Sequence, residues 1–358
     1  MRTIHFLTAA ALIHVLAGTL RASAGEPLLV PVSIGAQESR VAVFLRNQET
    51  SGSCPRAYVL LPGLGSNHWT MERIAEEIPA PNLVVSLDYL GYGESAKLKV
   101  KRVPNGFYSL ESDALVLLQV LRDVLPECGP ISLLGHSYGA AVAFEALIND
   151  SQKEGFSQQL DRIDSLVLVS TPTPWMTEIP PAIADLESRS CFEIKLGAIF
   201  GKIRERVVMK LLETSYSRIE VAEEVFLLTR SELTHCRRHR ATLKRIRSLR
   251  RRLEPEQSKA MRSALRGLTI PTLVIAGTTD RITPAALQKN LVSQLPLAEY
   301  RPLCGAHGIQ YEYAARIVGE SYIFTSAILA EFPRLQPPKN EDVGQHSDRN
   351  ARSLDPQE

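Results

Sequence analysis

A serine in a glycine-flanked motif is the first residue of this chain that could act as a nucleophile. Residues 135–139 read Gly-His-Ser-Tyr-Gly, a G-x-S-x-G pattern with Ser137 at its centre. An apolar, strand-like run at 131–134 precedes the motif, and an apolar, helix-like segment at 140–148 follows it. A serine at such a sharp strand-to-helix turn has strained backbone geometry and presents its hydroxyl. We therefore expect Ser137 to be available for nucleophilic attack.

A histidine and an aspartate further along the chain could complete the chemistry. A serine hydroxyl needs a base at neutral pH, and a histidine suits this because its ordinary pKa lies near the working pH. His307 lies in a small-residue loop after a strand-like run, and Asp280 follows the preceding strand-like run. The imidazolium that forms needs a carboxylate beside it. Two alternatives stay open, that Asp280 only caps the helix near Pro284 and that His307 is a surface residue.

The elements that must position these residues alternate between strand-like and helix-like runs. Apolar runs predict strands at 28–34, 41–45, 57–61, 82–87, 131–134, 163–169, 271–277 and 299–303. Periodic runs predict helices at 69–78, 110–125, 140–148, 284–295 and 309–332. The first two strands suggest an antiparallel hairpin, and the later alternation predicts a mostly parallel sheet with helices on both faces, an α/β fold.

The alternation stops at residues 171–267, where we expect only helices and loops. After the first 24 residues, we therefore divide the chain into a sheet domain at 25–170 and 268–332, a helical insertion at 171–267 and a disordered tail at 333–358. Residues 1–24 combine a charged start, an apolar run and an A-x-A site, the layout of a secretory signal peptide. We expect export after cleavage following Ala24, with an uncleaved N-terminal membrane anchor as the alternative.

The charge balance is nearly neutral. The chain has 41 Lys and Arg against 39 Asp and Glu, and loss of Arg2 and Arg21 with the signal peptide leaves 41 − 2 = 39 of each sign. This balance gives no indication of nucleic-acid binding. The spacing of His and Cys suggests no metal site, and the sequence leaves the oligomeric state open.

Taken together, these residues resemble the α/β-hydrolase fold over residues 28–332. The resemblance rests on the 135–139 motif, the Pro-Gly-Leu-Gly loop at 62–65, the segment 88–95, and the order Ser, Asp, His of the three catalytic candidates. It implies a serine hydrolase without cofactor or metal that acts on a small-molecule ester or related acyl bond through an acyl-enzyme on Ser137. It also implies an oxyanion hole formed by the backbone N–H groups of Leu64 and Tyr138. Pro62-Gly63 replaces the usual His-Gly of that loop.

Other activities could use the same three residues. An amidase or peptidase, a thioesterase, a C–C hydrolase and a cofactor-free perhydrolase remain alternatives, as does a non-enzymatic binding scaffold. The motif has no aspartate nucleophile, which disfavours haloalkane dehalogenases and epoxide hydrolases. Asp88 is a possible second acid, but we expect it to cap its own turn.

In this fold an insertion after the sixth strand forms a lid over the serine. We take Trp69, Trp175 and Met176 as candidate substrate contacts, and packing within the lid as the alternative for the lid residues. Other apolar residues of the insertion could line the same pocket: Ile179, Phe192, Ile199 and Phe200. An apolar pocket here would favour esters with short-to-medium acyl chains.

Residues 235–252 of the insertion hold nine Lys or Arg and no acidic residue. A solvated helix is our default interpretation. The alternative is that this segment docks on an anionic membrane surface or binds an acidic substrate. The sequence does not decide between them.

The chain has five cysteines, an odd number for a protein that we expect to be exported. In the α/β-hydrolase strand order the strands that follow Cys54 and Cys128 are neighbours. The resemblance thus places these two cysteines at one end of the sheet and favours a disulfide between them. Cys191 and Cys236 could also pair, and Cys304 is left near His307.

Overall fold

The computed structural model describes residues 25–48, 54–97, 103, 106–125, 128–149, 155–188 and 202–331. The expected signal peptide and tail lie outside these residues. The described strands are β1 Leu28–Ile34, β2 Gln37–Arg46, β3 Ala57–Leu61, β4 Leu83–Asp88, β5 Ile131–His136, β6 Ile163–Val169, β7 Thr272–Gly277 and β8 Ala298–Leu303. The helices of the sheet domain are η1 His68–Met71, α2 Glu72–Glu77, η2 Ser95–Lys97, α3 Leu110–Val124, α4 Tyr138–Ile148, α6 Ser157–Asp161, α13 Ala285–Val292, α14 Ile309–Glu312 and α15 Ala314–Glu331.

The eight strands form one sheet in the order β1-β2-β4-β3-β5-β6-β7-β8. β1 pairs antiparallel with β2, β2 pairs antiparallel with β4, and the remaining neighbours pair in parallel. This confirms the predicted mostly parallel α/β sheet. Because parallel strands end at the same edge, the loops after β3, β5, β7 and β8 meet there, and these loops carry the catalytic candidates.

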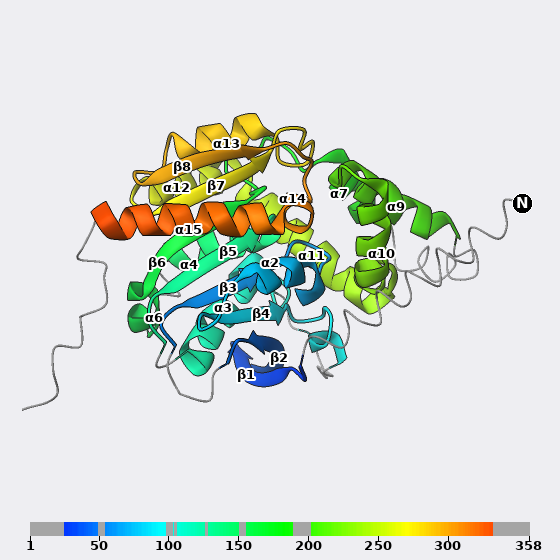
Figure 1. Ribbon diagram of the computed structural model, residues 1–358. Coiled ribbons are helices and arrows are strands. Elements are labelled where there is room, and N and C mark those ends of the chain that lie inside the picture. The colour runs from blue at the N-terminus through cyan, green and yellow to red at the C-terminus, as the bar shows by residue number, and fades with distance from the viewer. Residues whose placement is uncertain are drawn as a thin grey trace, which may run out of the picture.

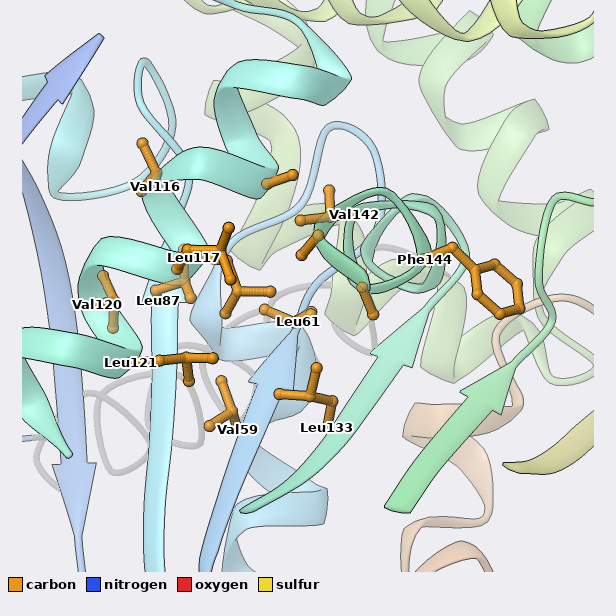
Figure 2. Packing of buried hydrophobic residues seen from close by; sticks show 14 of the residues in the cluster. Val59, Leu61, Leu87, Val116, Leu117, Val120, Leu121, Leu133, Val142 and Phe144 are labelled. Atoms are coloured by element: carbon orange, nitrogen blue, oxygen red, sulfur yellow. The ribbon is translucent and has the colours of Figure 1, made fainter. Parts of the chain in front are cut away.

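Helices cover both faces of the sheet, so its central strands are apolar throughout. Along β3, Val59 and Leu61 pack in one core cluster, whereas Tyr58 and Leu60 pack in the other, which follows the two-residue period of a strand. The first cluster joins the sheet to α3 and α4, as Figure 2 shows for Leu61 and its neighbours. The second joins it to α2 and α15. The sheet is therefore a rigid base for the loops at its carboxyl edge.

The expected insertion between β6 and β7 holds only helices and loops in its described part. Its helices are α7 Pro181–Ser188, α9 Lys202–Ser215, α10 Ile219–Thr234, α11 Cys236–Arg252 and α12 Pro255–Arg266. Figure 1 shows α7, α9 and α10 grouped at one end of the sheet, beside α14.

Two helix predictions need correction. The helix predicted at 69–78 is a 3-10 turn, η1, followed by α2. The helix predicted at 309–332 is divided into α14 and α15 by Tyr313, whose backbone leaves the helical region at φ −130° and ψ 36°. The sequence did not predict the short helix α6.

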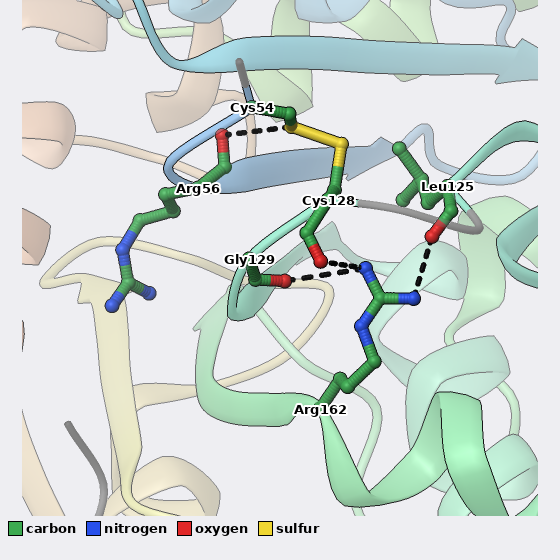
Figure 3. The surroundings of a disulfide bond; sticks show 6 residues. All are labelled: Cys54, Arg56, Leu125, Cys128, Gly129 and Arg162. Atoms are coloured by element: carbon green, nitrogen blue, oxygen red, sulfur yellow. Dashed lines mark hydrogen bonds between the residues drawn. A yellow bond between two sulfur atoms is a disulfide. The ribbon is translucent and has the colours of Figure 1, made fainter. Parts of the chain in front are cut away.

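The disulfide favoured by the resemblance is present between Cys54 and Cys128. It joins the segments that lead into the neighbouring strands β3 and β5, as Figure 3 shows. The side chain of Arg162 donates to the backbone carbonyls of Leu125, Cys128 and Gly129 and so fixes one side of the bridge. Cys304 is an exposed free thiol. The alternative Cys191–Cys236 pair falls on side chains outside the described part.

Candidate active site

Ser137 stands at the turn between β5 and α4 in a strained conformation. Its φ of 51° and ψ of −117° lie in a region that residues other than glycine rarely adopt. The turn is also crowded. A Cβ on Gly139 would lie 2.1 Å from the carbonyl oxygen of Leu61, and one on Gly135 would lie 2.5 Å from the amide nitrogen of Ala140. Only glycine fits at these two positions, which accounts for the motif.

The structure brings Ser137, His307 and Asp280 together from three loops at the carboxyl edge of the sheet. His307 Nε2 lies 2.9 Å from the hydroxyl oxygen of Ser137, and its Nδ1 lies 2.9 Å from Asp280 Oδ2. His307 follows β8 and Asp280 follows β7, the neighbouring strand. This geometry allows the imidazole to accept the serine proton while the carboxylate stabilises the imidazolium.

Asp280 caps its own loop as well as binding His307. Its Oδ1 accepts hydrogen bonds from the amides of Ile282 and Thr283, both at 2.8 Å, and its Oδ2 accepts one from the Thr283 hydroxyl at 2.8 Å. Burial alone would raise the pKa of Asp280, but the attraction of His307 and the hydrogen bonds from His307 and Thr283 lower it to about 2. The carboxylate is therefore charged at neutral pH.

His136, inside the motif, contacts the backbone of His307. Its Nε2 lies 3.0 Å from the backbone carbonyl of His307, and a carbonyl can only accept, so this nitrogen carries the proton. Burial, together with repulsion from His307, lowers the pKa of His136 to about 3 and keeps the ring neutral. Sequence reasoning placed His136 in the motif without a role, and only the fold reveals this contact.

The turn between α9 and α10 holds the other side of the His307 loop. Ser217 Oγ accepts a hydrogen bond from the amide of Ala306 at 3.1 Å, and the carbonyl of Ser215 accepts one from the amide of Gly308 at 2.5 Å. Glu312 accepts from the amide of Ser217 at 2.9 Å. The insertion thus fixes the loop that carries His307.

The two expected oxyanion donors lie beside Ser137. A Cβ on Gly63 would lie 3.6 Å from the Cβ of Ser137, so the loop that carries Leu64 passes directly alongside the serine. Tyr138 is the first residue of α4, where a backbone N–H has no acceptor within the helix. Leu64, Ser137 and Tyr138 line the same cavity.

This cavity has a volume of about 70 Å³ and lies between the serine and the insertion. Apolar side chains form most of its wall, including Met176, Ile179 and Ile183 from the insertion and Met261 from α12. Met176 is therefore where the sequence placed it.

The two tryptophans that the sequence suggested as substrate contacts, Trp69 and Trp175, do not line this cavity. Trp175 packs against the first core cluster, and Trp69 lies beside His68 with ring centroids 4.6 Å apart. Neither is among the residues that line the cavity. Phe192, Ile199 and Phe200 lie outside the described residues.

The expected cap role of Asp88 is confirmed. It accepts hydrogen bonds from the backbone amides of His68 at 2.7 Å and Glu94 at 2.8 Å, and its Oδ1 lies 2.9 Å from His68 Nδ1. Asp88 therefore joins the loops after β3 and β4.

The basic segment 235–252 is only in part the solvated helix that we took as the default, since Arg240, Arg247, Arg250 and Arg251 are exposed. It forms α11, and Arg245 in its middle is fully buried in an ion pair with Asp113. Arg238, Arg247, Arg250 and Arg252 are also paired with acidic residues. Hydropathy cannot distinguish a solvated arginine from a paired one, so the sequence missed this role.

Within the described ranges, no cluster of three or more His, Cys, Asp or Glu side chains could hold a metal ion. Across the same residues, no helix has the length and apolar character to cross a membrane.

The model of the alpha/beta hydrolase family matches residues 58–320, most of the chain. The chain belongs to this family. Among curated proteins, this alpha/beta hydrolase resembles the magnesium-chelatase 30 kDa subunit of Rhodobacter capsulatus, with 25% identity over 259 residues, 72% of this chain and 82% of the relative.

Solved structures share the fold of this alpha/beta hydrolase at low sequence identity. A putative lipase from Acinetobacter baumannii matches with a TM-score of 0.64 and 16% identity, covering 89% of this chain and 97% of that one. A membrane phospholipase A described as a bacterial virulence factor matches with a TM-score of 0.63 and 17% identity, covering 91% and 94%. An esterase from Thermogutta terrifontis matches with a TM-score of 0.59 and 18% identity, covering 87% and 100%.

Proposed function

We propose that this protein is a serine hydrolase that cleaves a carboxylic ester through an acyl-enzyme on Ser137. The observation that carries the proposal is the line from the Ser137 hydroxyl through His307 to Asp280, with both contacts at 2.9 Å. The serine oxygen attacks the ester carbonyl and its proton passes to His307 Nε2. The alcohol leaves with that proton, and water, activated by the same nitrogen, then releases the acid and restores the serine.

The surroundings of Ser137 support this mechanism. The tetrahedral intermediate places a negative charge on the former carbonyl oxygen, which two backbone amides stabilise best. The amides of Leu64 and Tyr138 serve this role in our proposal, because both residues line the cavity beside the serine.

The cavity supports a short, apolar acyl group as the substrate portion nearest the serine. Its volume of about 70 Å³ is far below the several hundred cubic ångströms of a pocket for a drug-sized ligand. Helices α9 and α11 of the insertion are hydrogen-bonded to the sheet domain. We therefore do not expect the insertion to open widely, as the lid of an interfacial lipase does.

We also propose that the protein is exported with Gly25 as its first residue. The Cys54–Cys128 disulfide supports an oxidising compartment, because such bonds rarely persist in the cytosol. Mass spectrometry of the exported protein tests this. An N-terminus that retains Met1 in the membrane fraction would favour the uncleaved anchor instead.

A substrate panel on the mature protein tests the activity. We expect turnover of p-nitrophenyl esters and its loss in Ser137→Ala, with an unchanged melting temperature. Matched thioester and anilide substrates distinguish the thioesterase and amidase alternatives, since each would prefer its own bond. No turnover of any panel member by the folded wild type would contradict the proposal.

A further inference from the structure

The inward face of α11 buries several polar side chains beside the apolar Ala241 and Ile246. Thr242, Arg245 and Ser248 recur at intervals of three residues and so share one face of the helix. All three are fully buried. Thr242 Oγ1 lies 2.7 Å from the Tyr92 hydroxyl, and Ser248 Oγ accepts a hydrogen bond from the amide of Leu110 at 3.0 Å. Helix α11 is therefore hydrogen-bonded to the sheet domain along this face.

Arg245 is the centre of this contact. Its Nε and Nη2 bind the two carboxylate oxygens of Asp113 at 2.6 and 2.8 Å, a bidentate pair, and Nη2 also donates to the carbonyl of Leu90 at 3.0 Å. The guanidinium lies over the ring of Tyr92, 4.5 Å from its centroid. Arginine suits this site because its planar fork matches a carboxylate and stacks on an aromatic ring.

Asp113 connects this arginine to the nucleophile elbow, the turn at 135–139 that carries Ser137. The hydroxyl of Tyr138 donates to Asp113 Oδ2 at 2.7 Å, and the Tyr138 ring meets Tyr89 edge-on with centroids 5.6 Å apart. Burial and the nearby carboxylate raise the pKa of Tyr138 well above its ordinary value, so its hydroxyl stays a donor. A continuous chain of bonds thus runs from the insertion to the residue directly after the serine.

Stability alone does not explain a buried ion pair at this point. Removing two charges from water costs several kcal/mol each, and apolar side chains of similar volume are often as stable or more so. The pair fixes the position of the Asp113 carboxylate, and with it the position of the Tyr138 hydroxyl. Strained backbone such as that of Ser137 persists only where its surroundings hold it.

We propose that Arg245 and Asp113 are positioning residues for the elbow. Through the side chain of Tyr138 they hold the strained backbone of Ser137 and the amide of residue 138 where acyl transfer needs them. Arg245 therefore ties α11 to the turn that carries Ser137, and α11 does not move as a lid. This inference rests on the proposed function.

Two variants and one control test the proposal. Tyr138→Phe removes a single hydroxyl and keeps the ring. The triple variant Tyr138→Phe/Asp113→Leu/Arg245→Met replaces the whole network by apolar side chains and leaves no unpaired charge. Thr242→Val is the matched control, because it breaks a buried hydrogen bond on the same face of α11 without touching Tyr138.

We expect kcat on p-nitrophenyl esters to fall about 10-fold in Tyr138→Phe and about 100-fold in the triple variant, with KM within about twofold of wild type. Thr242→Val should keep wild-type kcat. Amide hydrogen exchange of the 131–142 segment provides a readout that needs no activity. It should quicken about 10-fold in the triple variant compared with the control.

If the triple variant keeps the kcat and the exchange rates of the wild type, the proposal is wrong, and the network has only a structural role. If the triple variant does not fold, an unchanged kcat in Tyr138→Phe has the same meaning. If the wild type turns over no ester, the proposed function fails, and the exchange comparison alone still decides whether the network holds the elbow.

Discussion

Substitution of Met261 by alanine should lengthen the acyl chain that the protein accepts. Met261 lies on α12, is half-buried, and lines the cavity of Ser137. Together with Arg252 it also lines a second cavity of about 330 Å³ that does not reach Ser137. Side chains that line both cavities lie between them. Met261→Ala should therefore join the two spaces.

The size of the effect follows from the cavity volumes. A cavity of about 70 Å³ is far smaller than a pocket for a drug-sized ligand, so we expect the wild-type optimum at butyrate or shorter. Each methylene that becomes buried contributes about 0.8 kcal/mol, or about fourfold in kcat/KM. Two additional methylenes in the joined cavity should raise the octanoate-to-butyrate ratio by up to about 16-fold.

The assay is kcat/KM on p-nitrophenyl esters from acetate to decanoate. Met176→Ala is the matched control, because Met176 lines the cavity of Ser137 and not the second one. Trp175→Ala should leave the profile unchanged, since Trp175 packs against the core. A Met261→Ala profile identical to that of wild type, or an equal shift in Met176→Ala, would refute the reasoning.

Three further predictions concern the triad, acid stability and the disulfide. Asp280→Asn should lower kcat about 10⁴-fold, because the histidine loses the charge that orients it, whereas Asp88→Asn should not; the reverse result on the same ester would show that the acid is misassigned. The pKa of about 3 for buried His136 predicts stability that is complete above about pH 6.5 and falls by up to about 1.4 kcal/mol per unit toward pH 3. Urea titrations of His136→Gln should show a shallower loss over that window, and equal slopes would contradict the assignment. Loss of the Cys54–Cys128 bond, with a sequence separation of 74, should lower the free energy of unfolding by roughly 4.5 kcal/mol at most. Five free thiols in the denatured, unreduced mature protein would show that the bond does not form.

Much of the fold could be predicted because its signals are local. The central strands are apolar on both faces, and their short runs separated by helical periods indicate a parallel sheet without further information. Ser137 was recognisable because Gly135 and Gly139 fit a turn that no other residue fits. Asp280 and His307 followed from their places after successive strands, which the sheet order brings to one edge.

The contacts that the sequence did not predict are long-range and polar. Arg245 and Asp113 are 132 positions apart, and nothing in either neighbourhood indicates that the two charges meet in the core. The bond from His136 to the His307 carbonyl spans 171 positions. Trp175 is apolar and close to the start of the insertion, so hydrophobicity could not distinguish a cavity wall from core packing.

The most direct test of the account is covalent labelling of the mature protein with a fluorophosphonate, followed by peptide mass spectrometry. We predict a single adduct on Ser137 at neutral pH, strongly slowed in His307→Gln and absent in Ser137→Ala. An unlabelled wild-type protein that is folded, or an adduct on another residue that persists in Ser137→Ala, would contradict the claim that Ser137 is the nucleophile.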